Sequence, residues 1–98
     1  MLWHVYLLRL HNGAVYVGCT NELERRLMEH RMGTGARVTS ESPTIDLIHS
    51  EPFRERSAAL KRERQLKRWS RAKKLALAKG RIDELHRLAK THEARHDQ

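Results

Sequence analysis

The first twenty residues carry a hydrophobic pattern that predicts a β-hairpin. Two runs of apolar, β-branched and aromatic residues, 3–8 and 14–19, flank an Asn-Gly step at 12–13. This arrangement is the strongest short-range sequence signal for two antiparallel strands joined by a tight turn. Each run contains one tyrosine, Tyr6 and Tyr16. Because side chains alternate between the two faces of a sheet, the pairing register decides whether these tyrosines share a face.

Two hairpin registers are compatible with the pattern. A two-residue loop would pair Arg9 with Tyr16 and would place the two tyrosines on opposite faces. A three-residue loop over 11–13 pairs Leu8 with Tyr16 and places both tyrosines on one face, and it leaves the other face almost wholly apolar. We prefer the second register for two reasons. It places the apolar core residues on one face of the sheet and the candidate site residues on the other, and it puts a glycine where such loops adopt a left-handed conformation.

A helix is predicted after the hairpin, and a third strand after that helix. Asn21 is the expected N-cap, with Glu24 three residues later as in a capping box, and Leu23 and Leu27 form the apolar stripe. Glycines at 33 and 35 end the helix, and a polar loop runs to residue 43. The residues 45–49 alternate well enough to be read as a strand.

The second half of the chain has helical periodicity. Helices are expected over 57–69, with Ser57 as the cap, and over 71–79. A last amphipathic helix has the apolar stripe Ile82, Leu85, Leu88 and Ala89. The predicted fold class is therefore α/β, with a small three-stranded antiparallel sheet flanked by helices. Residues 1–79 form the expected domain, and 80–98 form a helical extension with a frayed tail.

The charge of the chain points to a polyanionic partner. The formal net charge is +8, and lysine and arginine are dense between residues 54 and 81. Such an excess favours nucleic acid, although many basic helices are only solvated surfaces. The sequence has no apolar run of about 18 residues and no secretory leader pattern, so we expect a cytoplasmic protein without a membrane span. A single cysteine, Cys19, excludes an internal disulfide.

Glu63 is the most informative single residue of the predicted helices. At 100° per residue it falls between Ala59 and Leu60, on the side that packs. A buried carboxylate without a partner is costly. Two partners are open: Lys67, four residues later, in an ion pair, or a metal ion at the rim of a cleft.

Arg26 and His30 lie four residues apart, on one face of the first helix. Taken alone, Arg26 has a simpler interpretation as a surface ion pair with Glu22 or Glu29. His30, Tyr6 and Tyr16 also have ordinary structural interpretations when each is taken alone, so only their combination carries a functional argument.

The combination resembles the GIY-YIG nuclease superfamily, in particular small stand-alone bacterial members. Val5-Tyr6 and Tyr16-Val17-Gly18 look like the paired signatures, with His4 in place of the first glycine. The resemblance covers about residues 3–79. It implies that five residues are catalytic: Tyr6, Tyr16, Arg26, His30 and Glu63.

The resemblance implies divalent-metal-dependent hydrolysis of a nucleic-acid phosphodiester, with Glu63 holding one Mg²⁺ or Mn²⁺ ion. The expected function is a DNA endonuclease that is directed by structure rather than sequence, in DNA repair or processing; RNA is the other candidate substrate. Six residues are the expected nucleic-acid contacts: Arg37, Thr39, Lys67, Arg71, Lys73 and Lys74.

Two departures from the family pattern keep a second hypothesis open. Leu75 stands where many members carry an asparagine, and Cys19 stands where some carry a lysine. The alternative is a nucleic-acid-binding module that keeps the fold but cleaves weakly or not at all. A less favoured alternative is a small adaptor whose C-terminal helix recruits another protein.

Overall fold

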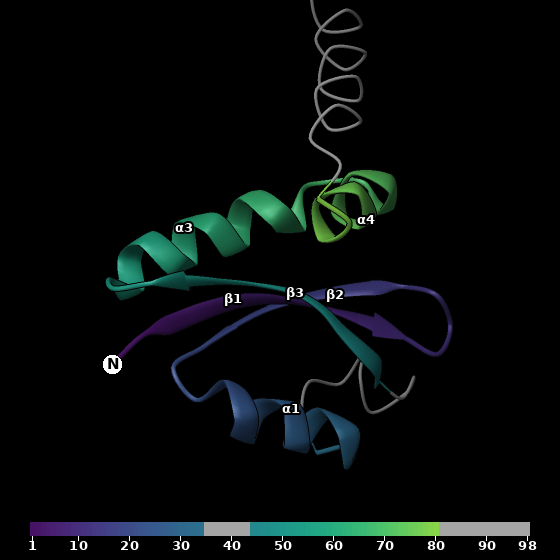
Figure 1. Cartoon of the computed structure of the whole chain (residues 1–98), viewed down its shortest axis with the longest axis horizontal. Coiled ribbons are helices and arrows are strands. Elements are labelled where there is room, and N and C mark those ends of the chain that lie inside the picture. Colours follow the sequence, from purple (N-terminus) through teal and green to yellow (C-terminus); the bar gives the residue numbers. More distant parts are fainter. Residues whose placement is uncertain (35–43, 81–98) are drawn as a thin grey trace, which may run out of the picture.

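The computed structural model describes residues 1–34 and 44–80 as a three-stranded sheet with helices on both faces. The elements are β1 (Trp3–Leu10), β2 (Val15–Thr20), α1 (Leu23–Arg31), β3 (Thr44–Phe53), α3 (Arg56–Lys67) and α4 (Arg71–Ala78). The strands lie in the order β2-β1-β3, and both pairings are antiparallel. Helix α1 covers one face, and α3 and α4 cover the other (Figure 1). The predicted fold class is confirmed, and no helix of the described part is long and apolar enough to cross a membrane.

The preferred hairpin register is confirmed. Leu8 pairs with Tyr16, so the loop has three residues rather than two. The turn is closed by two backbone hydrogen bonds of 2.9 Å, from the Leu10 amide to the Ala14 carbonyl and from the Gly13 amide to the Leu10 carbonyl. Gly13 has a φ of 88°, a value that side chains with a Cβ rarely adopt. The turn therefore fixes which face each tyrosine occupies.

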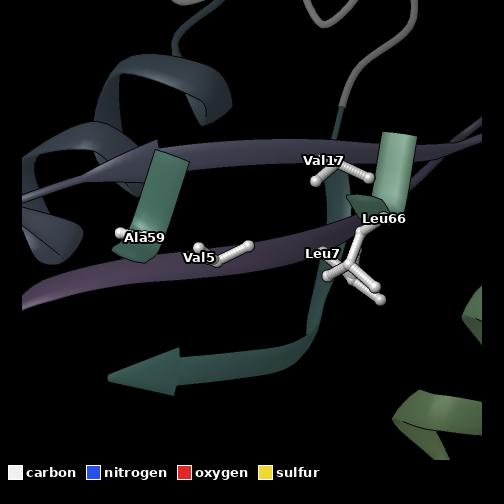
Figure 2. Close-up of a cluster of buried hydrophobic side chains, with 5 residues drawn as sticks. All are labelled: Val5, Leu7, Val17, Ala59 and Leu66. Atoms are coloured by element: carbon white, nitrogen blue, oxygen red, sulfur yellow. The ribbon is translucent and has the colours of Figure 1, made fainter. Parts of the chain in front are cut away.

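The sheet separates two buried clusters. The cluster beneath α3 is aliphatic, with Ala59 and Leu66 of the helix packed onto Val5, Leu7 and Val17 of the hairpin (Figure 2). The cluster on the α1 face contains Tyr6, Leu8 and Leu10, with Leu23 and Leu27 of the helix against it. Burial of each large aliphatic side chain contributes about 1.5–3 kcal/mol, so the two clusters hold both helical layers to the sheet.

Both predicted side-chain caps of α1 and α3 are wrong. The Thr20 hydroxyl accepts from the Glu22 amide at 3.0 Å, while the Asn21 side chain is directed to the Met1 sulfur. Strand β2 extends to Thr20, so this threonine makes the turn and Glu22 occupies the N-cap without a side-chain hydrogen bond. Helix α3 begins one residue earlier than predicted, with Glu55 rather than Ser57 at its N-cap.

Strand β3 is longer than predicted, because it continues through Pro52 to Phe53. A proline is tolerated there since β3 is an edge strand of the sheet. The sequence alternation breaks at Ile48, and the structure shifts its pairing register there: Leu7 pairs with His49, but Leu8 pairs with Leu47. The bulge-like irregularity thus explains the imperfect pattern.

A half-buried ion pair joins β3 to α3. The Glu51 carboxylate accepts from the Arg62 guanidinium at 2.8 and 3.0 Å, and the His49 imidazole lies 2.8 Å from it. Burial would raise the pKa of Glu51, but the hydrogen bonds from Arg62 and His49 outweigh it and lower that pKa. The Arg62 guanidinium also lies over the Trp69 ring, at 5.2 Å from the centroid. We call Glu51 and Arg62 the α3 clamp, since together they fix this helix against the sheet.

Helix α4 begins as predicted, and its N-cap is made by the side chain of Ser70, which accepts from the Lys73 amide at 3.2 Å. The predicted helix with the stripe 82–89 and most of the polar loop lie outside the described residues. Gly33 has a φ of 77°, which agrees with its predicted place at the end of α1.

Candidate active site

The Tyr6 ring lies across Gly18, its pairing partner on the neighbouring strand. A Cβ added at Gly18 would stand 2.3 Å from both the ring carbon and the hydroxyl oxygen at the end of Tyr6. The second glycine of the paired signatures is therefore explained by close packing, because the ring needs the space that any side chain would fill. Tyr6 itself is 1% exposed.

Tyr6, Tyr16 and His30 form one aromatic cluster on the α1 face. The Tyr6 hydroxyl oxygen lies 3.0 Å from Nε2 of His30, and both residues are buried. The two tyrosine rings have their centroids 6.4 Å apart, and the Tyr16 ring lies 5.2 Å from the imidazole in an edge-on arrangement. Two strands and one helix thus bring together three of the predicted catalytic residues.

The Tyr6 phenol is held in its protonated form. Burial raises the pKa of Tyr6 to about 12, although a hydrogen bond with the Arg26 guanidinium acts in the opposite direction. The nearby Tyr16 and Glu63 also raise it. A free phenolate is therefore scarce at neutral pH. Tyr6 is an effective base only if its own proton leaves as it takes another.

His30 is the group that can accept that proton. Burial lowers the pKa of His30 below 6.5, and the positive charge of Arg26 lowers it further, while Glu29 has a weaker opposite effect. The imidazole is therefore neutral at pH 7. With its proton on Nδ1, its Nε2 accepts from the Tyr6 hydroxyl; with its proton on Nε2, it donates to that oxygen.

Arg26 lies beside this pair. Burial opposes its ionisation, but contacts with Tyr6 and Glu29 raise the pKa of Arg26. Its Nη1 is 3.3 Å from the Glu29 carboxylate, so of the two ion pairs proposed from the sequence the structure forms the second. The side chain is 32% exposed, which leaves part of the guanidinium open to a ligand.

Glu63 lies on the opposite face of the sheet, on α3. Its side chain is only 17% exposed, in agreement with the predicted packed position, and its carboxylate pairs with Lys67 at 3.4 Å. Its charge still acts on the Tyr6 phenol. Gly18 explains how the Glu63 charge comes near Tyr6. The Tyr6 ring extends over β2 at a position that carries no side chain, and β2 is an edge strand of the sheet.

The remaining predicted contacts divide into two groups. Arg37 and Thr39 lie outside the described residues. Lys67 ends α3, and Arg71, Lys73 and Lys74 lie on α4. Arg71 donates through Nε to the Gly13 carbonyl at 2.7 Å, and the Lys73 ammonium lies 4.5 Å from the Trp69 centroid. Lys74 is half-buried, which lowers its pKa. All four therefore lie on the face opposite the aromatic cluster.

Two site features were missed from the sequence. The first is the role of Glu29 in orienting Arg26. The sequence suggested their ion pair only as a surface contact that would make Arg26 non-catalytic, yet the same guanidinium contacts both Glu29 and Tyr6. The packing of Tyr6 on Gly18 was also missed. Once the register was chosen, the pairing of position 6 with position 18 was the signal that could have revealed it.

We expect Gly18→Ala to displace Tyr6 from His30 and to lower the free energy of unfolding by about 1–3 kcal/mol, the usual cost of overpacking a filled core. Urea denaturation measures the loss. As a control, the same substitution in a Tyr6→Leu background should cost much less, since the ring that the methyl group meets is gone. An equal loss in both backgrounds would show that the Tyr6 contact is not the cause.

The fold and this cluster define the class of protein. Residues 2–76 match the model of the GIY-YIG catalytic domain, and the chain belongs to this family. The superfamily consists of nucleases, so at the family level the chain is a nuclease domain with nucleic acid as its class of substrate.

Close relatives carry the designation UPF0213. The UPF0213 protein of Xanthomonas axonopodis pv. citri is 49% identical over 74 residues, which cover 76% of this chain and 72% of the relative. A solution structure of the UPF0213 protein BH0048 from Bacillus halodurans is similar, with a TM-score of 0.52 at 32% identity, covering 81% of this chain and 84% of that one. The protein EF2693 from E. faecalis gives a TM-score of 0.54 at 36% identity, covering 94% and 88%. These structures support the same fold.

Proposed function

We propose that this protein is a divalent-metal-dependent endonuclease that hydrolyses DNA phosphodiester bonds. The observation that carries the proposal is the contact of Tyr6 with both His30 and Arg26, where its ring lies over Gly18 of the edge strand β2 and where the Glu63 charge also acts. Such a set offers a proton acceptor, a fixed cation and a carboxylate. Those are the groups that attack on a phosphodiester needs.

Arg26 supplies the fixed cation. Charge builds up on the non-bridging oxygens of a phosphodiester during attack, and a planar guanidinium can meet two of them at once. The Glu29 carboxylate and the Tyr6 hydroxyl hold the guanidinium in place before the substrate arrives. Little reorganisation is then needed as charge develops, which is the source of the rate enhancement.

Tyr6 and His30 supply the proton path. As an attacking water loses its proton to the Tyr6 oxygen, the phenol passes its own proton to Nε2 of His30. This concerted transfer avoids a free phenolate, which a pKa of about 12 would make scarce. Of the two tyrosines, Tyr6 is the one whose hydroxyl has a hydrogen bond to the imidazole. We therefore assign the base to Tyr6.

Glu63 is the residue that would hold the metal. Mg²⁺ takes hard oxygen ligands, keeps several waters and is bound through one or two carboxylates together with substrate phosphates. A single carboxylate fits this requirement, and among the described residues no group of three His, Cys, Asp or Glu side chains forms a closed site. When bound, such an ion polarises the phosphate and stabilises the leaving oxygen.

The basic helices support substrate choice by structure rather than sequence. Contacts from lysine and arginine to phosphates give affinity but carry no sequence information. With a net charge of +8, the protein has the charge to bind any duplex or single strand. A role in DNA repair or processing within the cytoplasm is the setting that fits such an activity.

Leu75 favours one alternative, a nucleic-acid-binding module that cleaves weakly or not at all. It is half-buried on α4 and has no polar group to position a substrate. Incubation of the protein with labelled single strands, duplexes, flaps and junctions, with Mg²⁺, with Mn²⁺ and with chelator, separates the two functions. Metal-dependent products support the nuclease. Binding without cleavage on every substrate supports the module.

Cleavage should lose rate on the acid side because His30 must be neutral to accept a proton. Since burial lowers the pKa of His30, we expect kcat/KM to hold down to about pH 6.5, the ordinary value, and to fall only below it. A pH profile of wild type measures this fall of kcat/KM at low pH, the acid limb of the profile. The His30→Gln protein should cleave much more slowly, and its profile should lack the acid limb. An acid limb of the same shape in His30→Gln would assign it to another group.

A further inference from the structure

One flank of α3 faces β2, which is an edge strand of the sheet in the described part of the chain. At 100° per residue, Arg56, Glu63 and Lys67 lie within an arc of about 40°. Helix α3 packs on β1 and β2, and its other flank is fixed by Arg62, which binds Glu51 on β3. Because β1 is the central strand, the flank that carries Arg56, Glu63 and Lys67 lies on the β2 side.

The three charges also act together on one side chain of β2. The pKa of Cys19 is raised by burial first and by Glu63 second, while Arg56 and Lys67 lower it. The thiol therefore stays neutral and adds no negative charge to this edge. The three charged residues that act on the pKa of Cys19 are thus the same three that the helical geometry places beside β2.

Cations lie near both ends of the hairpin. Arg56 has its guanidinium carbon 5.4 Å from the centroid of the Trp3 ring, at the start of β1. A guanidinium stacked on an aromatic ring keeps its in-plane N–H donors available for a phosphate. At the other end, Arg71 is held against the Gly13 carbonyl of the hairpin loop. Glu63 lies between them along α3.

We propose that one sugar–phosphate strand of DNA runs along the outer edge of β2, with Arg56 on one side of Glu63 and Lys67 and Arg71 on the other. The inference rests on the proposed function in one respect only, namely that the phosphodiester bond beside Glu63, at the centre of this strand path, is the bond that is cut. Arg56 to Lys67 spans eleven helical steps, about 16 Å, which corresponds to roughly five nucleotides of one duplex strand.

Lys67 is suited to such a contact although it pairs with Glu63. Its side chain is 54% exposed, whereas that of Glu63 is 17% exposed, so the ammonium is on the solvent side of the pair. An exposed ion pair of this kind breaks readily, and a passing phosphate can take over the lysine. Arg56 is the new assignment, because no motif of the sequence marked it.

The test measures binding of the full chain to a fluorescent DNA duplex by anisotropy, without metal, over about 50–200 mM salt. Each phosphate contact contributes about 0.9 to the slope of log affinity against log salt, so Arg56→Gln should reduce the slope by about one. The matched control is Lys61→Gln, which removes the same charge from an exposed position of α3 about 140° away from Arg56. Its slope should equal that of wild type.

An unchanged slope in Arg56→Gln, or an equal reduction in Lys61→Gln, would overturn the proposal. Arg56→Lys should restore the slope, and thermal melts of each variant confirm that the fold is kept. Cleavage is assayed separately. Wild-type protein that binds as expected but never cleaves would refute the proposed function and leave the strand path standing, whereas normal cleavage with an unchanged Arg56→Gln slope would refute the path alone.

Discussion

The Glu63→Gln protein should fold as wild type does and should cut DNA at least about 10²–10³-fold more slowly, the loss found when one preorganised electrostatic group is removed from an active site. The amide keeps the size and shape of the side chain. It lacks the charged oxygen that a hard divalent ion prefers. Titration of Mn²⁺ by calorimetry should therefore show binding to wild type and none to the variant.

Lys67→Met is the control that distinguishes Glu63 as a metal ligand from Glu63 as the ion-pair partner of Lys67. If Glu63 serves only Lys67, both substitutions remove the same interaction and should destabilise equally. Since Lys67 is 54% exposed, that interaction is worth at most about 1 kcal/mol after solvent screening. Assays at saturating DNA compare the rate per folded molecule. Equal destabilisation with full cleavage in both variants would make Glu63 a structural residue and would leave the nuclease without its metal ligand.

Tyr6→Phe should lower kcat by about 10²–10⁴-fold, the range of general base catalysis, with little change in DNA affinity. The substitution removes the hydroxyl that lies against His30 and Arg26 and keeps the ring that packs on Gly18. A loss of about 0.5–1.5 kcal/mol in stability is expected for the missing hydrogen bond, so rates must be given per folded molecule.

Tyr16→Phe is the matched variant for this assignment. Tyr16 shares the cluster and lies 5.2 Å from the imidazole in an edge-on contact that its ring alone can make. We expect a smaller loss of kcat than for Tyr6→Phe. A larger loss for Tyr16→Phe would move the base to the second tyrosine and would leave Tyr6 with the task of holding His30 and Arg26.

The shared face of the two tyrosines could be predicted because local chemistry determines it. The turn needs a glycine with positive φ, and only one loop length gives a uniformly apolar second face. The helical spacing of Arg26 and His30 was equally local. For these residues, the sequence pattern and the structure depend on the same short stretch of chain.

The face occupied by Glu63 could not be predicted in the same way. Its angular position on α3 gave its burial, but the side of the sheet on which α3 packs depends on the whole topology. The N-cap of α1 was predicted wrongly for a related reason: β2 continues to Thr20, whose hydroxyl accepts from the Glu22 amide, and the helix begins with Glu22 rather than Asn21 at its N-cap. Where several polar residues stand before a helix, the end of the preceding strand decides which of them occupies the N-cap.

The α3 clamp has a consequence for how ionic strength acts on the protein. Its side chains are only 22% exposed, and such internal pairs are screened far less than contacts at the surface. Salt that strips a polyanion from Arg56, Lys67 or Arg71 should therefore leave Glu51 and Arg62 joined, and α3 in place. A wash at high ionic strength can then remove bound nucleic acid from the purified protein without loosening the helix that carries Glu63.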